Sequence, residues 1–373
     1  MIVVPRLSLG LTADFEGKHI KPDDLFTHVL MPGATGTGKS NKLLDWWMET
    51  CMYKVSRILI DPGGLAETAF AYSKGKCHYL SAESPISVNP LRANFQPHQI
   101  FYILIEALNQ LIERTTPNDK LTSKMRVIFQ RDFNWCIEKH RFSLDALRER
   151  IGICKDDAQT RDGILARLDV LLSDPVFKDI LCGDHSIDIG TLIDRQETLI
   201  IDCSQFSRDQ MIFLGTIVIN LIKSYFRYSR PKEYKPMLVF IDEALNFLSS
   251  DIFSVLREGR KYKVAFILAV QDFPRDAENI IRMLLSNAGT LLSFKVGYRE
   301  ASFLQKEFRG MSLEQIQFPE KYWACFRTRD DEGIVKTRKA LPVKPLEIKK
   351  EPKNEVKLDE IKWFELNPIF PKD

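Results

Sequence analysis

The sequence predicts an α/β protein with a mainly parallel sheet that is covered by helices on both faces. Short apolar segments of strand length at residues 27–31, 55–61 and 197–202 alternate with segments of helical periodicity. This alternation is typical of βαβ units, in which parallel strands are buried on both sides. Two further observations refine the prediction: a glycine-rich loop follows the first strand, and a long helical stretch separates the second strand from the third.

The remaining elements follow from the same alternation. Each further apolar run is short enough for a strand and is followed by a stretch with one apolar helical face. The segments "YWACFRTRD" and "GIVKTRKA" predict a closing hairpin, and the N-terminal residues predict one or two small strands before the loop. We expect strands at 237–242, 264–270 and 289–295, and helices at 39–53, 209–226, near 250–260 and near 276–285.

Changes in composition along the chain predict four regions. Between about residues 97 and 182 helical periodicity dominates, and Ser143 has the chemistry of a helix N-cap. From Leu341 onward Lys, Glu and Pro dominate. We therefore expect a short N-terminal β segment at 1–26, a nucleotide-binding core at 27–96 and 187–340, an all-helical insertion at 97–186 and a C-terminal tail at 341–373.

Composition and charge describe a globular protein with no overall bias towards nucleic acid. The 373 residues include 53 Lys and Arg against 50 Asp and Glu, so nucleic-acid contact must come from local patches or from repetition in an oligomer. Seven cysteines without a C-x-x-C pair predict reduced thiols, and the histidine spacing predicts no structural zinc. Without a membrane-spanning apolar run or a signal pattern, we expect a cytoplasmic protein that reaches a membrane only through a partner.

The most specific signal in the sequence is a phosphate-binding loop. The segment "HVLMPGATGTGKS" fits G-x-x-x-x-G-K-[ST] in full and lies between a predicted strand and a predicted helix. Small residues let consecutive backbone N–H groups surround phosphate oxygens, and the helix N-terminus adds its dipole. Lys39 is expected to reach the terminal phosphates of a nucleotide, and Ser40 to coordinate Mg²⁺. The loop consists of Gly33, Ala34, Thr35, Gly36, Thr37, Gly38, Lys39 and Ser40.

Two acidic residues indicate that nucleotide binding leads to hydrolysis. The segment "MLVFIDEALNFL" delivers Asp242 and Glu243 to the carboxyl end of a strand, where an open α/β sheet binds its ligands. Asp242 is expected to hold Mg²⁺ through water, and Glu243 to orient and deprotonate the attacking water. The alternative is that two acidic residues end a strand only for solubility. A switch GTPase fits poorly, because the [NT]-K-x-D guanine signature is absent after the core strands.

Gln271 and Arg260 flank the next strand and have different expected roles. Gln271 follows the strand directly, where its amide can hydrogen-bond the γ-phosphate or the attacking water. Arg260 precedes the same strand and so lies towards the opposite end of the sheet. It can reach the nucleotide of a neighbour in a ring, as an arginine finger in trans. On chemistry alone, an alternative explains Arg260 equally well. It would belong to a basic turn that contacts solvent or DNA phosphate, formed by Arg257, Arg260, Lys261 and Lys263.

These motifs together resemble the HerA/FtsK superfamily of ring ATPases, which includes the coupling proteins of conjugation and type IV secretion. The phosphate loop, "SVNPL" at 87–91, "FIDEA", "REGRKYKVAFILAVQ" and "LLSNAGTLLSFKV" at 284–296 match the superfamily in the same order from about residue 19 to 340. The resemblance implies a RecA-like P-loop NTPase core, with Lys39, Ser40 and Asp242 on Mg-ATP. It also implies that Glu243 is the catalytic base.

The resemblance extends to assembly and substrate. It gives Gln271 the role of γ-phosphate sensor and Arg260 that of the finger in trans, which implies a homo-hexameric ring. The usual work of the superfamily is the pumping of DNA, mostly duplex, through a central pore. The chain departs from the pattern because it lacks the N-terminal membrane segment, the full β-barrel and the winged-helix-sized domain that various members carry. We therefore expect a motor core that depends on a protein partner: a loader, a nuclease or a membrane anchor.

The sequence leaves the translocated substrate open. The segment "RYSRPKEYK" at 227–235 and the turn at Arg257–Lys263 are candidates for tracking a nucleic-acid backbone. For the first, a solvated connection between a helix and a strand is the better explanation. No motif for reading bases is visible. The leading hypothesis is a hexameric ATPase that translocates DNA without sequence specificity. Its alternatives are a type IV secretion-type ATPase that drives protein export or assembly at a membrane, and a nucleotide switch without sustained turnover.

Overall fold

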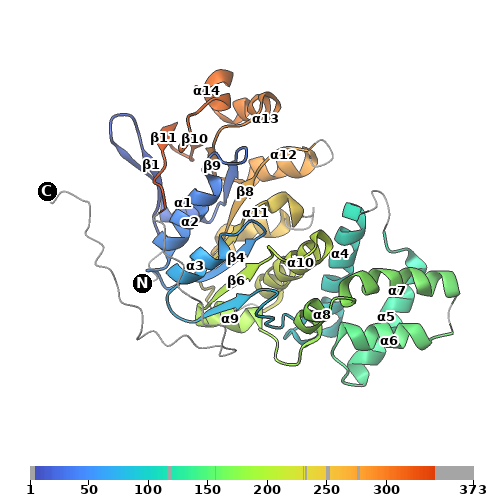
Figure 1. Ribbon diagram of the computed structural model, residues 1–373. Helices are drawn as coiled ribbons and strands as arrows, with labels where there is room; N and C mark the ends of the chain where they lie inside the picture. The colour runs from blue at the N-terminus through green and yellow to red at the C-terminus, as the bar shows by residue number, and fades with distance from the viewer. Residues whose placement is uncertain are drawn as a thin grey trace.

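The structure, a computed structural model, contains one large sheet with helices on both sides (Figure 1). It describes residues 5–115, 120–155, 157–229, 231, 233–248, 253–274 and 278–340. The expected tail from Leu341 therefore lies outside the described residues. The strands are β1 (Leu7–Leu11), β2 (Gly17–Ile20), β3 (Val29–Pro32), β4 (Ser56–Asp61), β5 (Cys77–Leu80), β6 (Thr198–Asp202), β7 (Met237–Ile241), β8 (Val264–Val270), β9 (Thr290–Ser293), β10 (Trp323–Arg327) and β11 (Glu332–Lys336).

A helix separates most consecutive strands of the described chain, whereas β1 and β2, and β10 and β11, follow each other without one. Helix follows helix between β5 and β6, and again between β9 and β10. Short helices also flank the sheet near both ends of the described chain. The helices are α1 (Pro22–Leu25), α2 (Lys39–Thr50), α3 (Ala66–Tyr72), α4 (Pro97–Thr115), α5 (Ser123–Glu138), α6 (Leu144–Ile153), α7 (Ala158–Leu172), α8 (Pro175–Cys182), α9 (Ile189–Arg195), α10 (Arg208–Ser224), α11 (Phe253–Tyr262), α12 (Glu278–Asn287), α13 (Tyr298–Leu304) and α14 (Leu313–Gln317).

The sheet has a parallel centre and an antiparallel edge. Its order is β2-β1-β11-β10-β9-β3-β8-β7-β4-β6-β5. The strands from β9 to β5 pair in parallel, and β10, β11, β1 and β2 continue the sheet as antiparallel neighbours. This arrangement confirms the predicted fold class and the closing hairpin of β10 and β11. The small N-terminal strands join the same sheet through β11, and the edge strand β5 was not predicted.

Side chains that alternate along the central strands build two apolar layers. On β4, Ile58 and Ile60 face the layer formed with α4, α9, α10, α11 and α12, while Leu59 faces the layer formed with α2 and α3. Trp46 and Trp47 of α2 are fully buried in the second layer. Both layers cover strands that are apolar on each face, which is the reason that these strands read as continuous apolar runs rather than alternating ones.

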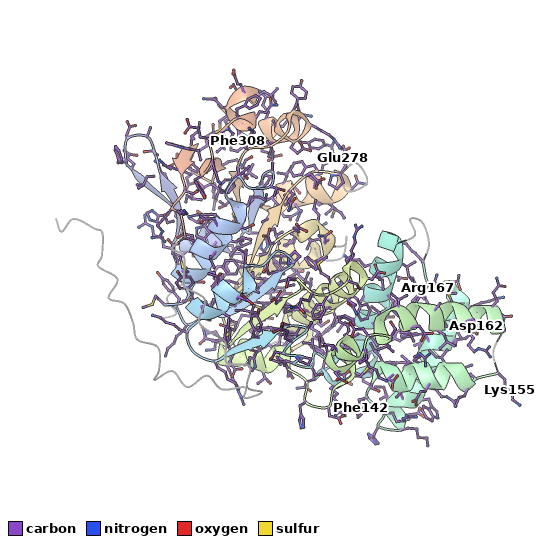
Figure 2. The ribbon with its side chains drawn as sticks, in the orientation of Figure 1. Phe142, Lys155, Asp162, Arg167, Glu278 and Phe308 are labelled. Atoms are coloured by element: carbon purple, nitrogen blue, oxygen red, sulfur yellow. The ribbon has the colours of Figure 1, made fainter. Side chains whose placement is uncertain are left out.

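Helices α4 to α8 form a group beside α10 rather than on the sheet itself (Figure 1). Figure 2 shows Lys155 and Asp162 at the end of this group farthest from the sheet. Phe101 of α4 packs against the rings of Phe129 and Phe133 of α5. Ser143 is the N-cap of α6, and its hydroxyl accepts a hydrogen bond from the N–H of Ala146 at 3.1 Å.

The segment 87–91 ties this helical group to the core. Ser87 Oγ donates to the carbonyl of Ile180 at 3.0 Å, and the N–H of Val88 donates to the same carbonyl at 2.8 Å. The amide of Asn89 donates to the carbonyls of Phe142 at 2.8 Å and Gly183 at 3.2 Å. These polar groups are buried, so their hydrogen bonds fix the loop rather than compete with water. Within the described ranges, none of the helices is both long enough and apolar enough to cross a bilayer.

Candidate nucleotide-binding site

The phosphate loop turns between β3 and α2 as the sequence predicts. Its first residues are anchored to β8 and to the segment after β9, because the N–H of Gly33 donates to the carbonyl of Val270 at 3.1 Å and the N–H of Ala34 donates to that of Lys295 at 2.7 Å. Gly36 and Gly38 have φ angles of 75° and 123°. Only glycine adopts such values without strain, so the spacing of the motif follows directly from the shape of the turn.

Two glycines also allow close packing around the loop. A Cβ on Gly33 would lie 2.7 Å from Cβ of Phe294, and a Cβ on Gly38 would lie 3.1 Å from Cδ1 of Tyr322. A Cβ on Gly36, by contrast, would meet nothing within 4 Å. The base of the loop is therefore tightly packed, while its exposed tip is open to a ligand.

Lys39 lies across the inside of the loop. Its ammonium group donates to the carbonyl of Ala34 at 2.9 Å and also to that of Gly33, and the side chain is buried. Thr37 Oγ1 donates to the carbonyl of Ala34 at 2.8 Å, which closes the turn. Burial lowers the pKa of Lys39, while Asp242 and Glu243 act in the opposite direction. A phosphate group in the loop would supply the anionic partner that this ammonium lacks.

Ser40 and Asp242 meet at the first turn of α2. Ser40 Oγ donates to Oδ2 of Asp242 at 2.8 Å, although the two residues are 202 positions apart. Asp242 follows β7, and its Oδ1 accepts a hydrogen bond from the N–H of Glu243 at 3.0 Å. A hydroxyl and a carboxylate beside a phosphate site are the donors that Mg²⁺ takes together with phosphate oxygens and water, so the residues present fit this ion.

Gln271 follows β8 and connects the phosphate loop to Glu243, a contact that the sequence did not predict. Thr35 Oγ1 donates to the amide oxygen of Gln271 at 3.0 Å, and the amide nitrogen of Gln271 donates to Oε1 of Glu243 at 2.7 Å. The other carboxylate oxygen of Glu243 accepts a hydrogen bond from Asn246 at 3.2 Å. No sequence motif points to Asn246. The strand order explains why Gln271 reaches both Thr35 and Glu243, because β8 lies between β3 and β7.

Glu243 has a left-handed backbone with φ of 50° and ψ of 44°. Such a conformation costs a non-glycine residue of order 1–3 kcal/mol and persists where the surroundings determine it. Here the backbone N–H of Glu243 is held by Asp242 and its carboxylate by two amides. This conformation places the carboxylate beside Gln271, which in turn contacts Thr35 of the phosphate loop.

Asp61 is a further residue of the site that the sequence analysis missed. It ends β4 beside β7, and its carboxylate accepts hydrogen bonds from the N–H groups of Gly63 at 2.9 Å and Ala66 at 2.7 Å. Burial raises the pKa of Asp61 to about 6, and the charge of Asp242 adds to the rise. A Cβ on Gly63 would lie 4.0 Å from Oδ2 of Asp242. Asp61 thus fixes the loop after β4 against the candidate magnesium ligand.

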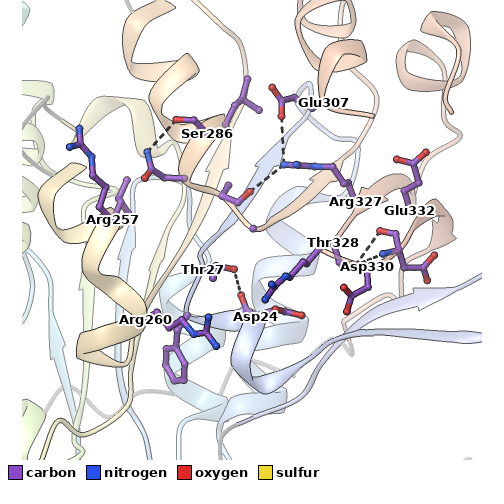
Figure 3. Close-up of a pocket in the computed structure, with 18 of the residues that line it drawn as sticks. Asp24, Thr27, Arg257, Arg260, Ser286, Glu307, Arg327, Thr328, Asp330 and Glu332 are labelled. Atoms are coloured by element: carbon purple, nitrogen blue, oxygen red, sulfur yellow. Dashed lines mark hydrogen bonds and ion pairs between the residues drawn. The ribbon is translucent and has the colours of Figure 1, made fainter. Parts of the chain in front are cut away.

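Arg260 lies at the opposite end of the sheet from this network, as its position before β8 predicted. Instead of the basic turn considered as an alternative, Arg257 and Arg260 lie one turn apart on α11. Both line a pocket of about 780 Å³ that also contains Asp24, before β3, and Gly289, before β9 (Figure 3). Because residues before β3 form this wall and Gly33 follows β3, the strand itself separates Arg260 from the phosphate loop of its own chain.

In the described part of the segment 227–235, Tyr234 packs against the rings of Phe226 and Tyr262, and charged residues make two further contacts. The guanidinium of Arg227 lies 5.7 Å from the centre of the Tyr228 ring, and Lys263 forms an ion pair with Glu233 at 3.5 Å. Arg230 and Lys232 lie outside the described residues. In the part of the chain that the structure describes, no cluster of three or more His, Cys, Asp or Glu side chains could hold a metal ion.

The strand order and the glycine-rich loop define a RecA-like P-loop NTPase fold. No protein-family model matches the sequence, and no curated protein matches it either. Solved structures do match. VirB4 of Thermoanaerobacter pseudethanolicus superposes with a TM-score of 0.67 at 14% identity over 89% of this chain and 96% of that chain. The conjugative coupling protein TrwB with an ATP analogue superposes with a TM-score of 0.68 at 13% identity, over 91% and 94%.

A second TrwB structure, in complex with ADP and Mg²⁺, matches with a TM-score of 0.67 at 14% identity over 90% of each chain. At this level of identity the similarity establishes the fold. The RecA-like core with helices on both faces, predicted from the sequence, is therefore confirmed. TrwB is a conjugative coupling protein, which is one of the classes of protein that the sequence resemblance indicated.

Proposed function

We propose that this chain is a subunit of a hexameric ATPase motor that couples hydrolysis of Mg-ATP to the translocation of duplex DNA through a central pore. The single observation that carries the ATPase part of the proposal is the network around the phosphate loop. Ser40 contacts Asp242 at 2.8 Å, and Gln271 bridges Thr35 and Glu243. Residues suited to bind phosphate, to ligate magnesium, to act as a base and to sense the nucleotide thus lie together at the carboxyl ends of the parallel strands.

The residues divide the work of holding the nucleotide. The backbone N–H groups of the loop and the ammonium of Lys39 take the β- and γ-phosphates, and Lys39 also neutralises charge that develops in the transition state. Ser40 and Asp242 hold Mg²⁺, which supplies electrostatic stabilisation of the phosphates when bound. The similarity to TrwB in complex with an ATP analogue and with ADP and Mg²⁺ supports this use of the loop.

Glu243 acts as the general base for the attacking water. Its carboxylate accepts a hydrogen bond from Gln271 at one oxygen and from Asn246 at the other, and loss of either bond makes that oxygen a better acceptor for the proton of water. Gln271 is the amide that also reaches the phosphate loop through Thr35. A γ-phosphate at the loop tip offers Gln271 an acceptor, which frees Oε1 of Glu243 to accept the proton of water.

The position of Arg260 supports the proposal of a ring. This exposed arginine lies in a pocket at the end of the sheet that its own phosphate loop does not reach. An arginine that completes the site of a neighbouring copy makes hydrolysis depend on assembly. The similarity of fold to VirB4 and to a conjugative coupling protein supports a motor of the secretion and conjugation kind. We expect DNA binding without sequence specificity, and loading by an accessory protein.

The rate of ATP hydrolysis with and without linear duplex DNA tests the proposal, on protein whose mass is measured by light scattering. A hexamer whose hydrolysis increases several-fold with DNA supports the motor. Hydrolysis that responds only to a protein partner or to membranes contradicts DNA translocation and favours a secretion-type ATPase. Negligible hydrolysis by protein that binds ATP contradicts both and favours a nucleotide switch.

A further inference from the structure

The arrangement of strands gives the bound nucleotide a direction, on the assumption that the proposed function holds. Glu243 and Gln271 follow β7 and β8, which both lie on one side of β3. The terminal phosphate therefore points to that side. The nucleoside is attached to the other end of the triphosphate, so it leaves the loop on the opposite side of β3, where β9 and β10 lie.

Tyr322 stands on that opposite side and touches the loop. It immediately precedes β10, and its N–H donates to the carbonyl of Thr37 at 3.2 Å. Its ring lies against Gly38, because a Cβ at that glycine would be 3.1 Å from Cδ1 of the ring. The side chain is half-buried, so part of the ring remains accessible beside the first turn of α2.

The backbone of Tyr322 is held in an unusual conformation. Its φ angle is 70°, in the left-handed region that bulky residues rarely adopt. Two hydrogen bonds from Thr337 to the carbonyl of Tyr322, from N at 2.7 Å and from Oγ1 at 2.9 Å, keep the residue in place. Strained residues of this kind cluster where a side chain must be presented to a ligand.

The segment that follows β11 lies beside α2, close to Tyr322 in the sheet. Asn41, in the first turn of α2, donates to the carbonyl of Arg338 at 2.9 Å and accepts from the N–H of Ala340 at 2.9 Å. The segment after β11 is thereby held along α2, one residue beyond the Thr337 that fixes Tyr322. Lys321 lies 5.3 Å above the centre of the Tyr322 ring, an exposed cation–π contact that contributes only about 0.5–1 kcal/mol and is easily displaced.

We propose that Tyr322 is the base-binding residue of the nucleotide site, and that its ring stacks on the purine of the nucleotide held by the phosphate loop. Every purine has a flat aromatic face on which the tyrosine ring can stack. Such stacking adds to affinity without hydrogen bonds to the edge of the base. The strained backbone presents the ring to the ligand, and the contacts to Thr37 and Gly38 set its distance from the triphosphate.

The test compares two probes by calorimetry on the full chain in the presence of Mg²⁺: a non-hydrolysable ATP analogue, and inorganic tripolyphosphate, which has no base. Tyr322→Asn removes the ring and still tolerates a left-handed backbone. We expect this variant to bind the ATP analogue about tenfold more weakly, since stacking on one base contributes about 1–3 kcal/mol. Tyr322→Phe keeps the ring and is expected to bind as the wild type does.

Affinity for tripolyphosphate is expected to stay within about twofold in Tyr322→Asn, because the phosphate loop is intact. Tyr298→Ala, which removes an aromatic side chain that is 66% exposed on α13, is the matched control and should change neither affinity. Unchanged binding of the ATP analogue by Tyr322→Asn would overturn the inference. Equal weakening of both probes would overturn it too, because the ring would then act on the loop. If the wild type binds neither probe, the proposed function itself fails.

Discussion

The amide nitrogen of Gln271 donates a hydrogen bond to Oε1 of Glu243 at 2.7 Å. The two residues follow neighbouring strands, and the amide oxygen of Gln271 accepts a hydrogen bond from Thr35 of the phosphate loop. The same side chain therefore contacts the phosphate loop and the carboxylate that we propose activates water. On the proposed mechanism, this geometry makes Gln271 the link between the state of the nucleotide and hydrolysis.

Gln271→Ala should lower kcat about 100-fold, the scale of losing one oriented hydrogen-bond donor in a site of this kind. ATP affinity should change little, since Lys39 and the loop are untouched. Steady-state hydrolysis and equilibrium ATP binding measure the two effects separately. Asn246→Ala removes the longer contact to Glu243, at 3.2 Å, and is expected to cost less. Wild-type turnover by Gln271→Ala would show that the bridge has no role.

Glu243→Gln should bind ATP normally and lose turnover by about 100-fold or more, because an amide cannot accept the proton of the attacking water. Binding and hydrolysis are measured on the same preparation. Asn246 can still bond the new side chain through its amide oxygen, so the fold should be retained. Hydrolysis at the wild-type rate would refute the assignment of Glu243 as the base.

Arg260→Ala should reduce hydrolysis roughly 1,000-fold if the side chain is a finger in trans. Mixing it with Glu243→Gln subunits should restore part of the activity. In a random one-to-one ring, about one quarter of the sites combine an intact Glu243 with a neighbour's intact Arg260. Arg257→Ala, one turn earlier on α11, is the matched control for loss of charge. Failure to recover activity in verified mixed rings would rule out a composite site.

His28 should make stability depend on pH. It is fully buried, its Nε2 bonds to the carbonyl of Leu256 at 2.7 Å and its Nδ1 accepts from the N–H of Phe266 at 3.0 Å. Burial lowers its pKa to about 4, below the value of about 6.5 in an unfolded chain. Between these two pKa values only the unfolded chain binds the proton. The contribution of neutral His28 to the free energy of unfolding therefore falls as the pH falls.

For His28 the loss between pH 7.5 and pH 5 amounts to about 2 kcal/mol. The raised pKa of Asp61 acts in the opposite direction, so the wild type alone does not isolate the effect. His28→Asn tolerates the φ of 66° at this position and should be less stable than the wild type at pH 7.5. The difference in the free energy of unfolding between the wild type and His28→Asn, measured with urea, should be about 2 kcal/mol smaller at pH 5. A constant gap would contradict the assigned protonation state.

Features that depend on local spacing could be predicted from the sequence. The glycines of the phosphate loop and the carboxylates after β7 are fixed by motifs, and the alternation of strands and helices predicted the layers. Asp61 could have been found by the same rule, because it ends a predicted strand as Asp242 does. The "PGG" that follows Asp61 has the composition of a turn, which by itself does not indicate a functional residue.

Other features depend on contacts between distant segments. The strand β5 is a short sheet edge without an alternating pattern, so its pairing with β6 gives it strand structure. The insertion of β8 between β3 and β7 brings Gln271 beside Glu243, and no local pattern encodes that order. The left-handed backbone of Tyr322 is imposed by Thr37 and Thr337, which lie far from it in the sequence or across a hairpin.

The central claim is that hydrolysis moves DNA, and displacement of a triplex-forming oligonucleotide from linear duplex DNA tests it most directly. The oligonucleotide is labelled and bound at a distance from the entry end, and its release is followed with ATP and with a non-hydrolysable analogue. We predict release by the wild type with ATP only, and none by Glu243→Gln. ATP hydrolysis by assembled hexamers with accessible DNA but without release would contradict translocation.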